Sequence, residues 1–331
     1  MPRSRVLLRA AAIACVTAVG MSMAASAQEW PERPIRVVTP LAPGGAADVL
    51  VRTVGEELTR NLKQQIVVEN RPGGGGSLAA MTVQRAAPDG YTLLLGSAQT
   101  HFIAPLLVKD AAYDPLADFT PLTIAAELPV CLVVPASFPA NNLKEFIAYA
   151  KANPGKLSFG SSGTHTTHHL AGEYFKSFLG LEMVHIPYRG GNPAMTDLLA
   201  GQIPVLVATL STTLQYIDSG KIKVLAMMES QRSSRRPDIP TVSETAPGFA
   251  VPKSWLGFLG PARMPPPLTQ KVHAELVKAI TAPGVRKHLE ASGFEVATSK
   301  SPEEFAAMLR NGVDLYRKIK AAARLGSEQV K

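Results

Sequence analysis

Three times in this chain, a short strand leads into a turn that contains glycine, and the turn leads into a helical pattern. The turns cover residues 40–48, 161–170 and 186–194. This rapid alternation of strand and helix signals predicts an α/β fold with parallel strands and helices on both faces of the sheet. In open sheets of this kind, ligands bind beyond the carboxyl ends of the strands. The three turns are therefore candidate binding segments.

The same pattern extends along most of the chain. Strands are predicted at residues 35–39, 65–69, 91–96, 130–135, 157–160, 183–186, 205–209 and 223–228. Helices are predicted at residues 48–62, 77–87, 143–152, 193–199, 268–280, 284–293 and 302–324, with a further helix opened by residues 161–169. A middle unit flanked by both ends of the chain suggests two lobes joined by a hinge.

The N-terminal segment predicts export. Three arginines precede a short apolar run at residues 10–19, and the small residues Ala25-Ser26-Ala27 follow. This order is typical of a secretory signal peptide, here residues 1–27 with cleavage after Ala27. The apolar run is too short for a membrane anchor. We therefore expect a periplasmic protein without its first 27 residues.

The two cysteines have different surroundings. Cys15 lies inside the predicted signal peptide, where lipidation of this residue stays an alternative. Cys131 is the one cysteine of the predicted exported chain, so no internal disulfide is possible. It sits in an apolar run and is expected to be a buried small hydrophobic residue, not a nucleophile.

Composition disfavours a role with nucleic acid. The net charge is +8, and removal of the three signal-peptide arginines, with no acidic residue beside them, lowers it to +5. No cluster of basic residues with interleaved aromatic residues occurs, so we expect no nucleic-acid partner. A modest positive charge is compatible with an anionic ligand.

The first turn, residues 40–48, has two equally good interpretations. Its glycines let a ligand approach the backbone, and free N–H groups at the start of the following helix favour an anion. Asp48 can instead cap the helix as part of an ordinary turn. A second glycine-rich segment, residues 69–77, lacks the Gly-Lys-Ser/Thr ending of a phosphate loop and is interpreted as a structural turn.

The later turns offer hydroxyl and N–H groups but no catalytic set. His165 and His169 are spaced i and i+4, yet the Glu of the H-E-x-x-H zinc motif is missing. Gly160 and Gly163 are too close for the G-x-S-x-G turn of a serine hydrolase. Arg189 could pair with an anion or remain solvated. We expect a binding protein that is not an enzyme, with no metal and no cofactor.

Taken in order, these segments resemble the Bug family of periplasmic substrate-binding proteins, which serve tripartite tricarboxylate transporters. The resembling segments are residues 37–48, 67–77, 86–94, 161–170 and 186–194, with Gly201. The resemblance implies a type II periplasmic-binding-protein fold with two α/β lobes, a hinge and a ligand cleft. It supports a division into lobe 1, residues 28–127 plus 249–331, and lobe 2, residues 128–248.

The resemblance also implies a ligand, a partner and a binding site. The ligand would be a small organic carboxylate, the partner would be the membrane permease subunits, and the protein would be a monomer. The implied contacts come from four strand-end segments, and the residues are Leu41, Gly45, Ala46, Asp48, Ser97, Gln99, Thr100, Ser162, Gly163, Thr164, His165, Thr166, Tyr188, Arg189 and Gly190.

Two departures from the family pattern bear on the ligand. The family usually carries small or serine residues where this chain has His165 and Thr166, and here His168 precedes the usual His-Leu. The family also usually carries an acidic residue where this chain has Pro204. These changes would alter the pocket but not the fold. Two other functions stay open: a ligand sensor that feeds a signalling receptor, and a periplasmic metal-dependent enzyme.

Overall fold

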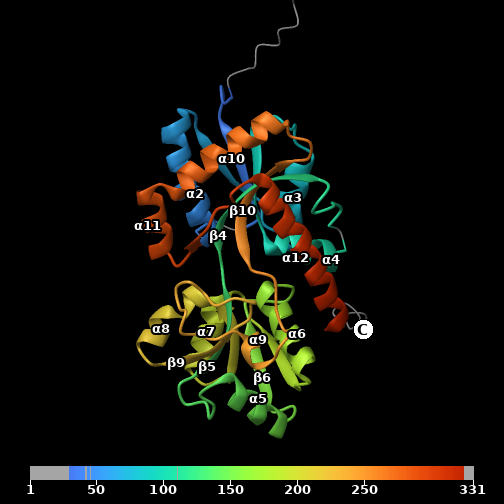
Figure 1. The fold of residues 1–331 in the computed structure, drawn as a ribbon, viewed down its shortest axis with the longest axis vertical. Coiled ribbons are helices and arrows are strands. Elements are labelled where there is room, and N and C mark those ends of the chain that lie inside the picture. The colour runs from blue at the N-terminus through green and yellow to red at the C-terminus, as the bar shows by residue number, and fades with distance from the viewer. Residues whose placement is uncertain (1–29, 42, 45, 110, 324–331) are drawn as a thin grey trace, which may run out of the picture.

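The computed structural model describes residues 30–41, 43, 44, 46–109 and 111–323, and the predicted signal peptide lies outside them. Two α/β lobes follow one another along the long axis of the molecule (Figure 1). Each lobe is built around its own sheet. Within the described ranges, no helix combines the length and the apolar character needed to cross a bilayer.

The sheet of lobe 1 has six strands in the order β11-β4-β10-β3-β1-β2. Its strands are β1 (Ile35–Thr39), β2 (Ile66–Asn70), β3 (Thr92–Ser97), β4 (Phe119–Glu127), β10 (Trp255–Pro261) and β11 (Glu295–Val296). β1, β2 and β3 are parallel, whereas β10 is antiparallel to both β3 and β4. The sheet is therefore mixed.

Helices cover both faces of this sheet. The lobe 1 helices are α2 (Ala46–Leu62), α3 (Ser77–Gln84), α4 (Ala104–Leu107), α10 (Pro266–Thr281), α11 (Pro283–Ala291) and α12 (Pro302–Ala322). Successive side chains of a strand point to opposite faces. Val37 thus packs in the core that contains Val54 of α2, and Val38 packs in the core that contains Phe305 of α12.

The sheet of lobe 2 has five strands in the order β7-β6-β8-β5-β9. They are β5 (Val130–Pro135), β6 (Leu157–Ser161), β7 (Met183–Pro187), β8 (Val205–Thr209) and β9 (Ile222–Met227). β6 is parallel to β7 and β8, and β5 is antiparallel to its neighbours. The helices of this lobe are α5 (Leu143–Ala152), α6 (Thr167–Leu179), α7 (Gly191–Leu199), α8 (Leu214–Asp218) and α9 (Val242–Thr245).

The chain passes between the sheets twice, and a helix forms a third link. β4 ends at Glu127 and β5 begins at Val130, while the return runs from the end of β9 to Trp255. The Leu128 N–H donates to the Ser254 carbonyl at 2.9 Å, which ties the two crossing segments together. Helix α12 extends from lobe 1 toward lobe 2 (Figure 1), where the Ser177 hydroxyl donates to the Ala322 carbonyl.

Most predicted elements occur within a few residues of their predicted bounds, but β4 was not predicted. Its sequence contains a proline and lacks a regular alternation of apolar and polar residues. Five of its nine residues are buried, and the strand lies inside the sheet between β10 and β11. Residues Gln99–Ile103 form a π-helix, which also has no simple sequence signal. The antiparallel strands make both sheets mixed, whereas the sequence predicted parallel strands alone.

Candidate functional site

Lobe 1 has a topological switch point between β1 and β3. From β1 the chain moves to β2 on one side of the sheet, and it then returns to β3 on the other side. The connections that leave β1 and β3 therefore diverge and open a crevice beyond the carboxyl ends of these strands. The two segments after these strands are residues 40–46 and 98–103.

A pocket of about 270 Å³ lies at this switch point. It contains four of the residues that the family resemblance implied, together with the glycine-rich turn that follows β2. The lining residues are Pro40, Leu41, Pro72, Gly73, Gly75, Gly76, Ser97, Gln99 and Thr100. The segment interpreted as a structural turn thus also forms a wall of this pocket.

Close packing requires glycine in that wall. Gly76 has φ +93°, and a Cβ at this position would lie 2.6 Å from Thr100 Cγ2. The sequence analysis did not assign a binding role to this turn. The signal that could have found it is its position, because β2 is parallel to β1 and ends at the same edge of the sheet.

Hydrogen bonds fix the β3 side of the pocket. The Ser97 N–H donates to Thr100 Oγ1 at 2.9 Å, and the Thr100 hydroxyl also contacts His101 Nδ1 at 2.8 Å. Thr100 is fully buried. The side-chain amide of Gln99 is half-buried and has no hydrogen-bond partner among the described residues. Gln99 therefore offers a ligand a polar side chain in this pocket.

Asp48 holds the first turn in place. Its carboxylate accepts hydrogen bonds from the Gly44 N–H, the Arg52 guanidinium and the Asn70 amide, at 3.0, 2.9 and 3.0 Å. The hydrogen bond from Arg52 is the main cause that keeps the pKa of Asp48 well below its ordinary value. Asn70, a residue that the sequence analysis missed, also donates to the Leu41 carbonyl.

Of the other predicted residues in the first turn, Ala46 is the first residue of α2 and Gly45 lies outside the described residues. Neither residue is among those that line the pocket. The lobe 1 site thus rests on Leu41, Ser97, Gln99 and Thr100.

Lobe 2 has a second switch point, between β6 and β8. From β6 the chain moves to β7 on one side and then to β8 on the other side, and all three strands are parallel. The carboxyl ends of β6 and β8 carry Ser161 and Thr209. The predicted turn, residues 161–170, begins at this edge, as expected for a ligand site.

A half-buried histidine links the two strand ends. His168 Nδ1 lies 2.6 Å from the Ser162 hydroxyl oxygen, and its Nε2 lies 3.0 Å from the Thr209 hydroxyl oxygen. Burial lowers the pKa of His168 to about 4, so the ring is neutral at physiological pH. A role for Thr209 was not predicted, because nothing in its local sequence distinguishes it.

The remaining residues of the turn form the start of α6. Thr166 is the N-cap residue, and its hydroxyl accepts from the His169 N–H and donates to the Gly163 carbonyl. His165 has a left-handed backbone with φ +59°, and its N–H donates to His169 Nδ1 at 3.2 Å. Thr164 is exposed. The hydroxyl and N–H groups that the sequence predicted are therefore present at this strand end.

The last predicted segment borders the same turn. The Tyr188 N–H donates to the Ser161 carbonyl at 3.1 Å, and the Tyr188 hydroxyl donates to Asp197. Arg189 is exposed, with no ion-pair partner among the described residues, and Gly190 precedes α7 with φ +117°. The structure therefore groups the predicted site residues into two sets, one at each switch point.

The described residues contain no group of three or more histidine, cysteine, aspartate or glutamate side chains arranged to hold a metal ion. The histidines near the second switch point have other partners. His185 Nε2 lies 2.7 Å from the Ser161 hydroxyl oxygen, and His169 Nδ1 accepts from the backbone of His165. These contacts build the turn and give no metal-ligand set.

Comparisons with known proteins agree with this architecture. Residues 50–320 match the family model described as the tripartite tricarboxylate transporter family receptor. BugT of Bordetella pertussis is 32% identical over 88% of this chain and 90% of its own length. A UPF0065 protein of Cupriavidus necator is 36% identical over 93% of this chain and 94% of its own length.

Solved structures of similar proteins share the fold over almost their full length. The periplasmic binding protein BugD has 34% identity and a TM-score of 0.73, and the match covers 89% of this chain and 99% of BugD. MatC from Rhodopseudomonas palustris, solved with bound malate, has 31% identity and a TM-score of 0.73 over 88% of this chain and 99% of MatC.

A second R. palustris protein, solved with adipate, has 28% identity and a TM-score of 0.76, with 89% of this chain and 99% of that protein covered. The chain belongs to the Bug family of periplasmic solute-binding proteins, the receptors of the tripartite tricarboxylate transporter family.

Proposed function

We propose that this protein binds a small organic carboxylate between its two lobes and presents it to a tripartite tricarboxylate-type permease. The observation that carries the proposal is the position of the two switch points. The two crossing segments between the lobes form the hinge. Ser97, at the end of β3, pairs with Leu256, which directly follows the second crossing segment. Thr209, at the end of β8, pairs with Val130, which also adjoins the hinge. Both sites therefore lie on the sides of the lobes that face the hinge.

The chemistry of the two sites suits an anion that has oxygen acceptors. Lobe 1 offers the amide of Gln99, and lobe 2 offers the hydroxyl of Ser162 and the N–H groups of the turn before α6. The Asp48 carboxylate, beside the lobe 1 site, is already occupied by Arg52 and Asn70. Neutral donors of this kind stabilise a carboxylate through charge-assisted hydrogen bonds.

The relatives support the chemical class of the ligand. One is bound to malate and another to adipate, and both ligands are dicarboxylates. We extend to this chain only the carboxylate class, since His165 and His168 give its lobe 2 turn a side-chain composition of its own. The protein would act in capture and delivery, and not as an enzyme.

Export and assembly complete the proposal. The signal peptide would be removed after Ala27, and the exported protein would act as a monomer in the periplasm. Lobe 1 would comprise residues 28–127 and 249–331, and lobe 2 residues 128–248. Ligand would favour the closed arrangement of the lobes, because only that arrangement lets both switch points contact it.

A thermal-shift screen tests this function. The purified protein is first unfolded and refolded to remove any carried-over ligand, and it is then heated with malate, adipate, citrate, glutamate or benzoate. Binding to the folded state alone raises the melting temperature by mass action. A rise with one or more carboxylates, and none with the matching amides, supports the proposal. Equal melting temperatures across the whole set would contradict it.

A further inference from the structure

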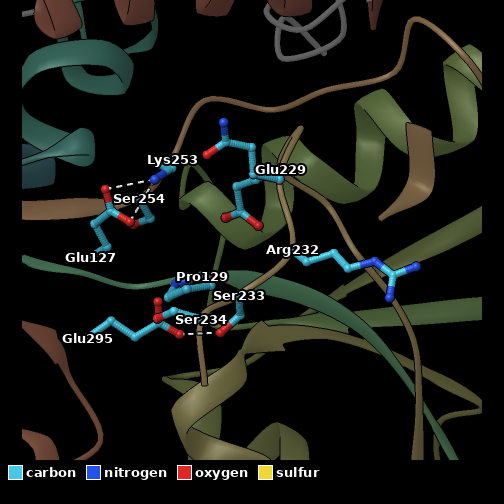
Figure 2. A pocket seen from close by; sticks show the side chains of 10 residues that line it. Glu127, Pro129, Glu229, Arg232, Ser233, Ser234, Lys253, Ser254 and Glu295 are labelled. Carbon is cyan, nitrogen blue, oxygen red and sulfur yellow. Dashed lines mark hydrogen bonds and ion pairs between the residues drawn. The ribbon is translucent and has the colours of Figure 1, made fainter. Parts of the chain in front are cut away.

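A second pocket, separate from both switch points, lies at the hinge. It has a volume of about 180 Å³, roughly six times the ~30 Å³ that a water molecule occupies in the liquid. Its walls come from both crossing segments and from β11 (Figure 2). The lining residues are Glu127, Pro129, Glu229, Gln231, Arg232, Ser233, Ser234, Lys253, Ser254 and Glu295.

The buried carboxyl group of Glu229 is the unusual feature of this pocket. The residue is 3% exposed. Its Oε1 accepts the Val130 N–H at 2.8 Å, but its Oε2 is buried without a hydrogen-bond partner among the described residues. In Figure 2 no dashed line joins this carboxyl group to the other side chains drawn. A buried acceptor without a partner costs free energy, so a donor that enters the pocket would be favoured.

The cationic side chains of the pocket are already paired. Lys253 Nζ lies 2.9 and 2.8 Å from the two carboxylate oxygens of Glu127. Arg232 pairs with Glu244, and Figure 2 shows its guanidinium pointing away from Glu229. Glu295 accepts a hydrogen bond from the buried Ser233 hydroxyl and forms no ion pair with a described residue. Neither Glu229 nor Glu295 therefore has an ion-pair partner in the described part of the chain.

We propose that the hinge pocket is a binding site for a small primary ammonium ion, held by Glu229 and Glu295. Its N–H groups would donate to Glu229 Oε2 and to the free lone pairs of the Glu295 carboxylate. The hydroxyl groups of Ser233, Ser234 and Ser254 supply further acceptors in the walls. The site differs from the proposed carboxylate site in both position and charge.

The position of the pocket couples it to the lobes. Glu229 follows β9 of lobe 2, Glu295 lies on β11 of lobe 1, and Glu127 and Ser254 border the two crossing segments. A ligand that contacts both glutamates connects the lobes and stabilises the hinge in this arrangement. Such a ligand shifts the equilibrium between open and closed lobes only if it binds one of these arrangements more tightly than the other.

Protons compete with the ammonium ion. Burial raises the pKa of Glu229 to about 8, with Glu127 raising it further and Lys253 and the Val130 N–H opposing the shift. Cys131 on β5 and Tyr316 on α12 also interact electrostatically with this carboxyl group. Both are neutral, because burial raises their own pKa values. The ammonium ion must displace a proton from Glu229 below pH 8, so its affinity rises with pH.

Thermal melting with ethylammonium chloride tests the site. Tetramethylammonium chloride is the matched control, because it carries the same charge but has no N–H donor. At pH 8.5 the wild-type protein should melt at a higher temperature with ethylammonium only, and the apparent affinity should fall on the order of tenfold at pH 6.5. No rise at pH 8.5, or an equal rise with tetramethylammonium, would overturn the proposal.

Two variants assign the effect to this pocket. Glu229→Gln keeps an acceptor for the Val130 N–H and should weaken ethylammonium binding at least tenfold, and Glu295→Gln should also weaken it. Glu182→Gln removes the same charge from an exposed position in lobe 2 and should leave binding unchanged. An unchanged affinity in Glu229→Gln would overturn the proposal. Either result is independent of carboxylate binding in the interlobe site.

Discussion

His168 contacts the hydroxyl group of Ser162 through a ring nitrogen, at 2.6 Å. The other ring nitrogen contacts the Thr209 hydroxyl at 3.0 Å. A neutral imidazole has one donor and one acceptor nitrogen, so one hydroxyl must donate to the ring and the other must accept from it. The hydroxyl that accepts keeps its own proton for a ligand. His168 therefore sets the direction of the donors at the lobe 2 switch point.

The first prediction concerns this histidine. His168→Ala should weaken the binding of the carboxylate found in the screen by about tenfold, because loss of a positioned hydrogen bond costs roughly 1.4 kcal/mol. Calorimetric titration measures the change. Thr212→Ala is the control and should bind normally, because among the described residues its hydroxyl group donates to the Thr209 carbonyl alone. Wild-type affinity in His168→Ala would remove His168 from the site.

Low pH should destabilise the fold through four histidine side chains. Burial lowers the pKa of His168 and His185 to about 4, and those of His101 and His169 to about 3. In the unfolded chain these groups titrate near 6.5, so below that pH the unfolded state binds protons first. The stability that these neutral histidines contribute should therefore be fully present above pH 6.5. The free energy of unfolding should fall as the pH decreases toward 4.

Urea melts between pH 7.5 and 4.5 measure this loss, which is about 1.4 kcal/mol for every pKa unit of a shift that is fully expressed. His288 is an exposed histidine, and the variant His288→Gln should show the same loss as the wild type. A free energy of unfolding that is flat over this pH range would show that the buried histidines titrate normally.

The third prediction concerns Gly163 in the lobe 2 turn. This residue has φ +132°, and a Cβ would lie 3.2 Å from the Tyr188 carbonyl oxygen. Gly163→Ala should therefore lower the free energy of unfolding by about 1–3 kcal/mol and displace the turn. Gly191→Ala is the matched control, since no atom lies within 4 Å of its Cβ position and its φ is ordinary. Equal melting of both variants would contradict the account.

Glu229 at the hinge should make the stability of the ligand-free protein depend on pH. The pKa of Glu229 is raised to about 8, above its ordinary value of 4.5, so the folded state holds the proton more tightly than the unfolded state. Its contribution to stability is present below pH 4.5 and is lost as the pH rises through 8.

Glu229→Gln should remove this loss. The variant should be more stable than the wild type at pH 8.5, by on the order of 1–3 kcal/mol, and nearly equal to it at pH 5. Chemical denaturation at the two pH values gives the difference. A variant that is less stable than the wild type at pH 8.5 would mean that the ionised carboxylate is stabilising.

The sequence predicted the parts of the structure that local signals specify. β1, β5 and β8 have their predicted bounds, and α5 begins after Asn142, whose side chain accepts the Glu145 N–H as an N-cap. Such strands and caps depend on short apolar runs and on residues close in the chain. The strand-end turns were found for the same reason.

Long-range contacts were beyond local signals. Asp48 could cap a helix or contact a ligand, and only the fold shows that Asn70, 22 residues away, binds its carboxylate. Thr209 joins the lobe 2 site through His168, 41 residues away. The hinge pocket brings together Glu127, Glu229 and Glu295, which share no sequence motif. Tertiary packing alone creates these groups.

The most direct test of the central claim is calorimetric titration of the best carboxylate into the wild type and two single-site variants. Gln99→Leu removes the amide donor of lobe 1, and Ser162→Ala removes the hydroxyl of lobe 2. If the carboxylate is held between the lobes, each variant should bind it roughly five- to tenfold more weakly, at unchanged stoichiometry. Wild-type affinity in either variant would show that the corresponding lobe does not contact the ligand and would contradict the account.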